Sequence, residues 1–163
     1  MTDLSRRTLL GSGVAAGIGL FVFARGSGPA EAAQRYEVTH SAQEWRRMLG
    51  PERYPVLREA HTERPGSSPL LKEHRRGIFA CAACGLPLYS SATKFESGTG
   101  WPSFWKPLPN AVLKRTDHAF GMERSEILCR RCGSHLGHVF DDGPKPTGLR
   151  YCMNGLSLTF RPA

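Results

Sequence analysis

Two short stretches decide how this chain folds: Cys81-Ala82-Ala83-Cys84-Gly85 and Cys129-Arg130-Arg131-Cys132-Gly133. Both have the form C-x-x-C-G, and the glycine after each pair lets the backbone turn so that both sulfur atoms face one ion. Together they supply four thiolates, which is the closed tetrahedral ligand set of a structural zinc site. We therefore predict one structural Zn²⁺ per chain, with the long gap between the pairs filled by an intervening subdomain.

The alternatives to zinc are two local disulfides, or one redox-active C-x-x-C pair with two spare thiols. A redox pair is expected at a strand-to-helix junction of a βαβ unit. The two pairs of this chain lie instead among short β-type runs. Two matched pairs of equal spacing favour the metal.

From Gly77 onward, short runs of β-branched and aromatic residues alternate with glycine and proline. This pattern predicts a mainly β, antiparallel domain. The chain has no G-x-G-x-x-G or Walker-type loop, which argues against nucleotide binding. The expected strands cover residues 77–81, 86–89, 111–116, 120–129, 138–140 and 149–160.

The region before these strands is expected to be helical. Ser41 and Glu44 form a capping box that begins a helix. Gly50-Pro51 ends this helix and begins a second short one, which Pro55 stops or kinks. Residues 61–76 have the composition of a loop. We expect this part to act as a helical brace without chemistry of its own.

The first 33 residues have the pattern of an export signal. Paired arginines, Arg6-Arg7, precede an apolar run that continues to about Ala24, and Ala30-Glu31-Ala32-Ala33 provides an A-x-A-type end. The paired arginines resemble a twin-arginine signal. We expect residues 1–33 to be a signal peptide, residues 34–163 to be the functional domain, and the destination to be the periplasm. An uncleaved signal that tethers the protein to the membrane remains the alternative.

The chain has 163 residues, a formal net charge of +8 and a sequence pI near 9.7. No long run of lysine and arginine is present, so the charge predicts a solvated positive surface and no nucleic-acid partner. The length indicates one domain plus the N-terminal segment.

The fifth cysteine, Cys152, has no partner in a pair. In an extended segment Arg150, Cys152 and Asn154 project from one face, because side chains alternate. A cationic neighbour favours the thiolate, which is the nucleophilic form. The alternative is a buried, inert cysteine. The apolar residues of 156–160 share the parity of Cys152, so we predict a β-bulge at Gly155 that turns them toward the core.

Two further stretches carry candidate binding groups. Residues 97–105 place three aromatic residues among glycines, and an indole such as that of Trp101 can hold a small apolar group and offer one N–H donor. Residues 134–144 contain His135 and His138, and histidine can donate a proton near neutral pH. The alternatives are a core plug for the aromatic residues, structural histidines, and a simple turn at the acidic pair that follows.

These motifs together resemble the methionine-R-sulfoxide reductases of the B type, over about residues 45–160. The matching stretches are Thr62-Glu63-Arg64-Pro65, both C-x-x-C-G pairs, Ser97-Gly98-Thr99-Gly100-Trp101-Pro102-Ser103-Phe104, His135-Leu136-Gly137-His138-Val139-Phe140-Asp141-Asp142-Gly143-Pro144 and Gly148-Leu149-Arg150-Tyr151-Cys152-Met153-Asn154. The resemblance implies two antiparallel sheets with short N-terminal helices, and structural zinc on the four paired cysteines. The activity it implies is reduction of the R-epimer of methionine sulfoxide as part of protein repair.

The resemblance also implies the site residues. Cys152 would attack the sulfoxide sulfur as a thiolate that Arg150 favours. His138, with His135 in support, would bind and protonate the oxygen, and Cys152 would become a sulfenic acid. The remaining residues would shape the pocket: Trp101 and Phe140 would hold the methyl group, and Asn154 would bind near the oxygen or order a water molecule.

One departure from the family bears on turnover. Many members place a second cysteine in the aromatic loop, where this chain has Thr99. We therefore expect no intramolecular disulfide, and regeneration by an external, thioredoxin-like thiol reductant. We also expect oxidised proteins or peptides as substrates, a monomer, and no membrane contact once the signal is cleaved.

Two rival functions use the same residues. A Cys-His-Asn hydrolase would employ Cys152, His138 and Asn154, but it needs neither the zinc pairs nor the aromatic loop. A non-enzymatic zinc-ribbon binding module would leave Cys152 and the histidines unexplained.

Overall fold

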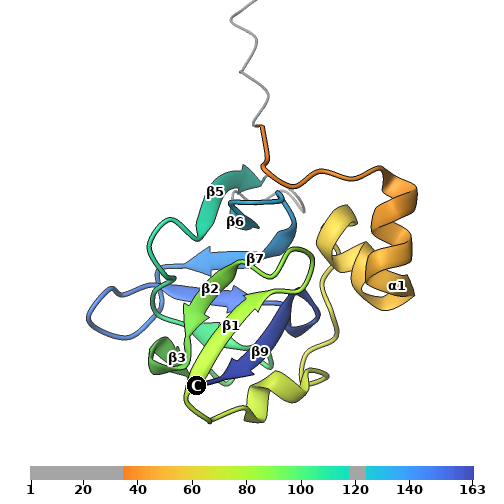
Figure 1. Cartoon of the computed structure of the whole chain (residues 1–163). Coiled ribbons are helices and arrows are strands. Elements are labelled where there is room, and N and C mark those ends of the chain that lie inside the picture. The colour runs from red at the N-terminus through yellow and green to blue at the C-terminus, as the bar shows by residue number, and fades with distance from the viewer. Residues whose placement is uncertain (1–34, 118–123) are drawn as a thin grey trace, which may run out of the picture. The chain divides into compact units, whose positions relative to one another are not determined.

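The computed structural model describes residues 35–117 and 124–163 (Figure 1). The expected signal peptide, residues 1–33, and the first four residues of the expected strand 120–129 lie outside this described part. Among the described residues, none of the helices combines the length and the apolar character needed to span a membrane.

The described chain is mainly β and consists of two antiparallel sheets, as expected (Figure 1). The smaller sheet has the order β2-β1-β9 and is formed by β1 (Gly77–Cys81), β2 (Pro87–Ser90) and β9 (Leu158–Pro162). The larger sheet has the order β3-β4-β8-β7-β6-β5 and is formed by β3 (Lys94–Phe95), β4 (Ser103–Phe104), β5 (Val112–Asp117), β6 (Arg124–Cys129), β7 (His135–Phe140) and β8 (Arg150–Met153).

The expected strand 149–160 is wrong in one respect, because it is two strands in different sheets. β8 ends at Met153, a 3₁₀ turn follows at Gly155–Ser157, and β9 then pairs with β1. The change of direction that we assigned to a bulge is therefore a change of sheet. A side chain at Gly155 would clash with the hydroxyl of Ser68, so the turn requires glycine.

The helix α1 (Ala42–Glu59) begins as the capping box predicts. The hydroxyl of Ser41 accepts a hydrogen bond from the backbone N–H of Glu44, and the Glu44 carboxylate accepts one from the backbone N–H of Ser41. Gly50 has non-helical angles and divides α1 into two segments, as expected.

Pro55 does not stop the second segment of α1, so that one of our two alternatives, a stop or a kink, is wrong. A proline inside a helix costs about 3 kcal/mol. Val56 and Leu57, which follow it, are buried against the core, and each such side chain contributes about 1.5–3 kcal/mol. Their burial offsets the cost, so the helix continues to Glu59. Within the expected loop 61–76, Pro69–Lys72 forms one 3₁₀ turn.

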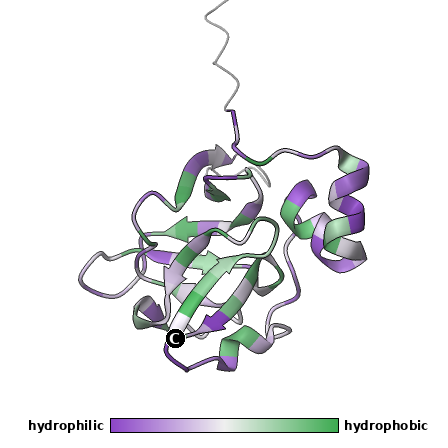
Figure 2. Ribbon diagram, viewed as in Figure 1, coloured by the Kyte–Doolittle hydropathy of each residue, from purple (hydrophilic) through white to green (hydrophobic). Residues whose placement is uncertain are grey.

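An aromatic core lies behind the strand that carries Cys152. The rings of Tyr89 and Phe104 are stacked at 4.4 Å, and the Tyr89 hydroxyl donates to the Sδ atom of Met153 at 3.1 Å. Met153 is fully buried and directly follows Cys152. The core therefore fixes β8 from behind, and Figure 2 shows the contrast between apolar β1 and the largely polar α1.

Candidate active site and metal centre

The four paired cysteines form one cluster. Cys81 ends β1 and Cys129 ends β6, while Cys84 and Cys132 lie in the turns that follow these strands. All four sulfur atoms lie within 4.8 Å of one another, and the pairs 81–132 and 84–129 are 3.8 and 3.6 Å apart. These separations are far longer than a disulfide bond, which is close to 2 Å.

The cluster has the dimensions of a structural zinc site. Four sulfur atoms at about 2.3 Å from a tetrahedral Zn²⁺ lie roughly 3.8 Å from each other, close to the distances observed. Gly85 and Gly133 have φ angles of 71° and 68° and close the two turns, as expected. The chain therefore holds structural zinc on its four paired cysteines, and this site joins the smaller sheet to the larger one.

Cys152 lies between two strands of the larger sheet, directly opposite Ser103 of β4 and His138 of β7. Burial raises the pKa of the Cys152 thiol above its ordinary value. A hydrogen bond from Thr99 and the charge of Arg150 act in the opposite direction but do not outweigh burial. The cationic neighbour thus acts with the expected sign, while the free protein holds Cys152 mainly as a thiol at neutral pH.

Arg150 is held by Asp142, which we expected only to form a turn. Its Nε and Nη2 atoms donate to the two carboxylate oxygens of Asp142, both at 2.8 Å. The guanidinium lies 4.5 Å over the ring of Phe140. Asp142 therefore orients the Arg150 guanidinium, which also interacts with Cys152. The interactions with Asp142 and Cys152 raise the Arg150 pKa.

A small pocket of about 150 Å³ opens beside Cys152. It brings together five of the seven predicted site residues, while His135 and Arg150 lie outside its lining. Three residues that we did not predict complete it. The lining consists of Thr62, Trp101, Arg124, Gly137, His138, Phe140, Cys152 and Asn154.

The aromatic wall of the pocket is fixed by Glu63. The indole Nε1–H of Trp101 donates to the backbone carbonyl of Glu63 at 3.1 Å. The N–H donor that an indole can offer is therefore used within the protein, and Trp101 presents its apolar ring to the pocket. The Glu63 carboxylate is buried and accepts the backbone N–H groups of Gly155 and Leu156 at 2.5 and 2.9 Å.

The segment after α1 is thus part of the site, contrary to our view of it as a brace without chemistry. The backbone N–H of Glu63 donates to Oδ1 of Asn154 at 3.0 Å, and Nδ2 of Asn154 donates to the carbonyl of Leu136 at 3.3 Å. Both ends of the Asn154 amide are therefore anchored within the protein, and these bonds use only one of the two Nδ2 hydrogens. In the sequence, only its place in the Thr62–Pro65 motif indicated that Glu63 could belong to the site.

Two histidines meet because β7 is irregular. Residues three apart in a regular strand point to opposite faces. Here the pairing with β6 shifts by one residue, with Ile127 opposite Gly137 and Leu128 opposite His135, so His135 and His138 face one cleft. A side chain at Gly137 would clash with the backbone oxygen of Cys152, which explains the glycine.

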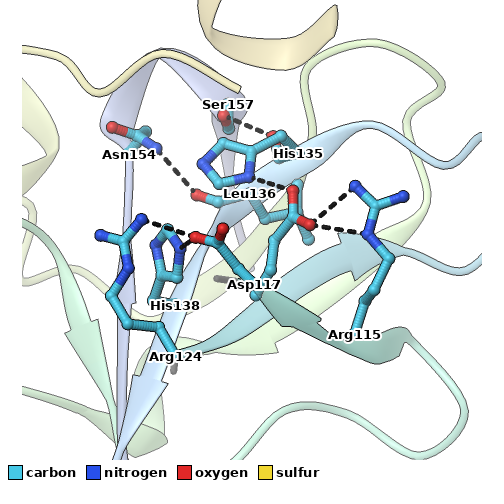
Figure 3. A network of polar contacts seen from close by, with 9 residues as sticks. Arg115, Asp117, Arg124, His135, Leu136, His138, Asn154 and Ser157 are labelled. Atoms are coloured by element: carbon cyan, nitrogen blue, oxygen red, sulfur yellow. Dashed lines mark hydrogen bonds and ion pairs between the residues drawn. The ribbon is translucent and has the colours of Figure 1, made fainter. Parts of the chain in front are cut away.

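Each histidine has a carboxylate partner (Figure 3). Nε2 of His138 lies 3.1 Å from the Asp117 carboxylate, and Nδ1 of His135 lies 2.7 Å from the Glu126 carboxylate. Burial lowers the pKa of His138, although the bond with Asp117 opposes this. The ring centroids of the two histidines are 5.4 Å apart. Both histidines line a second cleft of about 600 Å³ that adjoins the small pocket.

A chain of hydroxyl groups lies on the β4 side of Cys152. Oγ1 of Thr99 is 3.9 Å from Sγ of Cys152. Oγ of Ser97 lies 2.8 Å from Oγ1 of Thr99 and 2.8 Å from Oγ of Ser103. Hydrogen bonds from Thr99 and Ser103 lower the pKa of Cys152 but do not outweigh burial, and composition alone gave no signal for Ser97 or Ser103.

Residues 49–162 match the family described as the SelR domain. A protein of Leptospira interrogans named peptide methionine sulfoxide reductase MsrB is 54% identical over 127 residues, which cover 77% of this chain and 97% of that protein. A protein of the same name from Thiobacillus denitrificans is 58% identical over 120 residues, covering 73% and 91%. Another, from Methanosarcina barkeri, is 54% identical over 125 residues, covering 76% and 88%.

Proposed function

We infer the reaction from the family: the chain belongs to the SelR domain family of B-type methionine sulfoxide reductases. It is a peptide-methionine (R)-S-oxide reductase, which converts the R-epimer of methionine sulfoxide to methionine. The observation that carries the chemistry is the position of Cys152 in a pocket with Trp101 and His138.

We propose that Cys152 attacks as the thiolate. Its sulfur bonds to the sulfoxide sulfur while the oxygen takes one proton. Transfer of the resulting hydroxyl group to the Cys152 sulfur then breaks both the new sulfur–sulfur bond and the S–O bond of the substrate. The products are methionine and a Cys152 sulfenic acid, so the substrate gains the two electrons that Cys152 loses. Arg150 and Thr99 support the thiolate by charge and hydrogen bonding.

His138 is the proposed proton donor. It lies opposite Cys152 in the pairing of β7 with β8, and it lines the same pocket. The Asp117 carboxylate binds its Nε2 atom and favours the protonated ring. His135 supports it from the adjoining cleft.

The pocket walls explain how one epimer would be selected. Trp101 and Phe140 supply apolar surface for the methyl group, and the polar edge of the pocket carries His138 and Asn154. A sulfoxide with its methyl group against the rings directs its oxygen to the polar edge in only one configuration. Asn154 assists by binding near the oxygen or ordering a water molecule, and its clamped amide keeps this edge in place.

The zinc site contributes to structure. The ion would be held by Cys81, Cys84, Cys129 and Cys132 and would link the two sheets, which contributes to the stability of the fold. This arrangement leaves Cys152 without a thiol partner among the described residues.

The decisive experiment uses both epimers of methionine sulfoxide, as free amino acid and within a peptide, with a dithiol as reductant. We expect turnover of the R-epimer alone, and faster turnover in the peptide. Flanking residues can be accepted by the cleft that the two histidines line and by another cleft, whose lining includes His61, Thr62 and Glu63. Reduction of the S-epimer at a similar rate would refute the assignment of stereochemistry.

Regeneration requires an external thiol. A thiol displaces water from the Cys152 sulfenic acid, and a second thiol releases the mixed disulfide. With substrate and no reductant, intact-mass analysis should show one added oxygen. The matched control is Thr99→Cys, which places a thiol beside Cys152 and should instead lose two hydrogens as a disulfide forms. An internal disulfide in the unaltered chain would overturn this proposal.

We further propose export by the twin-arginine route and function as a monomer in the periplasm, with a membrane-relayed thiol donor. Arg6-Arg7 before the apolar run supports this. Replacing both arginines by lysine should retain the protein inside the cell, and N-terminal sequencing of exported protein should begin at residue 34. Export of the lysine variant at the original level would contradict the route, and an exported protein that keeps its first residues would indicate a membrane tether.

A further inference from the structure

The cleft beside the catalytic pocket contains a second network of charged residues. The reaction as described gives no role to the arginine and the carboxylate of this network. Arg115 donates to Glu126 through Nε and Nη2, at 2.9 and 2.7 Å, and Glu126 binds Nδ1 of His135 at 2.7 Å (Figure 3). This network lies beside the His138–Asp117 pair. Each of the two networks consists of a cation, a carboxylate and a histidine on neighbouring strands.

Glu126 is a carboxylate at neutral pH although it is buried. Burial alone would raise its pKa, but the hydrogen bonds from His135 and Arg115 outweigh this effect and lower the pKa. An ionised carboxylate only accepts hydrogen bonds. Nδ1 of His135 must therefore carry a proton, and this defines the tautomer of the ring.

The other ring nitrogen of His135, Nε2, does not bind Glu126. Nε2 is buried and has no hydrogen-bond partner among the described residues, while the whole side chain is only 3% exposed. A buried polar atom without a partner is costly, so its retention calls for an explanation. In the neutral ring, Nε2 is an acceptor, and both His135 and His138 line the cleft.

We propose that Glu126, anchored by Arg115, is a positioning residue for the reduction: it holds His135 as the Nδ1–H tautomer, so that Nε2 accepts hydrogen bonds in the cleft beside His138. This inference deepens the proposed function and rests on the role given there to the histidine pair. Orienting carboxylates of this kind fix both the tautomer and the direction of an imidazole.

The first test compares two carboxylates of the same cleft. Glu126→Gln keeps the shape but removes the charge, and it should lower kcat roughly tenfold or more with KM changed less than about twofold. Glu59→Gln is the matched control, because Glu59 lines the cleft but pairs only loosely with Arg46, at 3.7 Å. Equal kcat values for the two variants would overturn the proposal.

A double mutant separates positioning from stability. His135→Asn keeps a donor toward Glu126 but removes the ring. If Glu126 acts through His135, then adding Glu126→Gln to His135→Asn should cost less than about twofold in kcat. A full tenfold loss in that background would refute the proposal. Zinc content and Tm of every variant show whether it is folded.

The tautomer itself can be observed without any turnover. In ¹⁵N-labelled Cys152→Ser protein, long-range ¹H–¹⁵N spectra should show His135 with protonated Nδ1 and bare Nε2. Glu126→Gln should mix the two tautomers. A His135 ring protonated on Nε2 in the parent protein would overturn the proposal even if the reductase activity is as described.

Discussion

The protein contains two cysteine environments, and they differ in how they are assembled. Each half of the zinc site comes from five consecutive residues, and its four sulfur atoms lie within 4.8 Å of one another. Cys152 instead collects its neighbours from β4, β7 and the segment around Glu63. The residue type is the same, so the surroundings decide that one set of thiolates binds metal and the other attacks a substrate.

The difference teaches that the two sites fail in different ways. A cluster whose members share one ion loses its function when any one ligand is lost. The activity of a nucleophile that depends on several separate residues should fall by an amount that depends on which residue is replaced. The following experiments test this contrast.

The largest effect is expected from Cys152→Ser. A hydroxyl at this position cannot take the two electrons that the thiolate gives up, so activity on the R-epimer should fall at least about 10⁴-fold. Zinc content and Tm should remain those of the parent protein, since Cys152 is not a ligand. Substantial residual activity would place the nucleophile elsewhere.

Cys129→Ser should break the other environment. Cys129 is fully buried, and loss of one ligand should release zinc and destabilise the fold by about 4–5 kcal/mol. Zinc per chain and thermal unfolding measure this directly. Activity should fall only as far as the folded fraction falls, and full zinc occupancy with an unchanged Tm would contradict the site.

His138→Ala should reduce kcat/KM by about 10²–10⁴-fold if the ring donates the proton. The matched control is His61→Ala, because His61 lines the neighbouring clefts but not the pocket of Cys152. The control should stay within about twofold of the parent. A loss under about threefold for His138→Ala would remove it from the role of acid.

The smallest effect is one of pH. Burial raises the Cys152 pKa and lowers the His138 pKa from their ordinary values, so the two pKa values bound a wide range of pH. Between these limits the thiolate fraction rises tenfold per pH unit while the protonated histidine falls tenfold, so their product is constant. The parent kcat/KM should therefore be flat between these two pKa values.

The same reasoning gives a sharper test in the variant. Without the histidine, His138→Ala should show a kcat/KM that rises about tenfold per pH unit over that range, because only the thiolate fraction remains. A flat profile for this variant would show that His138 does not supply the proton.

Local features were predictable from the sequence. The C-x-x-C-G pairs, the capping box at Ser41 and the strand Gly77–Cys81 all depend on residues within a few positions of each other. Their physical causes, which are turn geometry, capping and alternation, act over the same short range. These features could therefore be assigned without knowledge of the fold.

The features that sequence reasoning missed depend on distant partners. The segment 149–160 alternates as one strand would, but its two halves pair in different sheets. The two histidines face one cleft only because β7 slips against β6. Glu63 and Glu126 look like ordinary charged residues until the fold supplies their partners.

The hydrogen bonds of Glu63 determine at which stage of folding the protein first becomes active. These bonds, to Asn154, Gly155 and Leu156, span 91 to 93 residues, and contacts this far apart form only after much of the chain is ordered. A growing chain that ends before residue 152 contains neither the nucleophile nor the groups that Glu63 holds. Catalytic activity of this enzyme is therefore a late event in its maturation, and it reports that the last strands have docked.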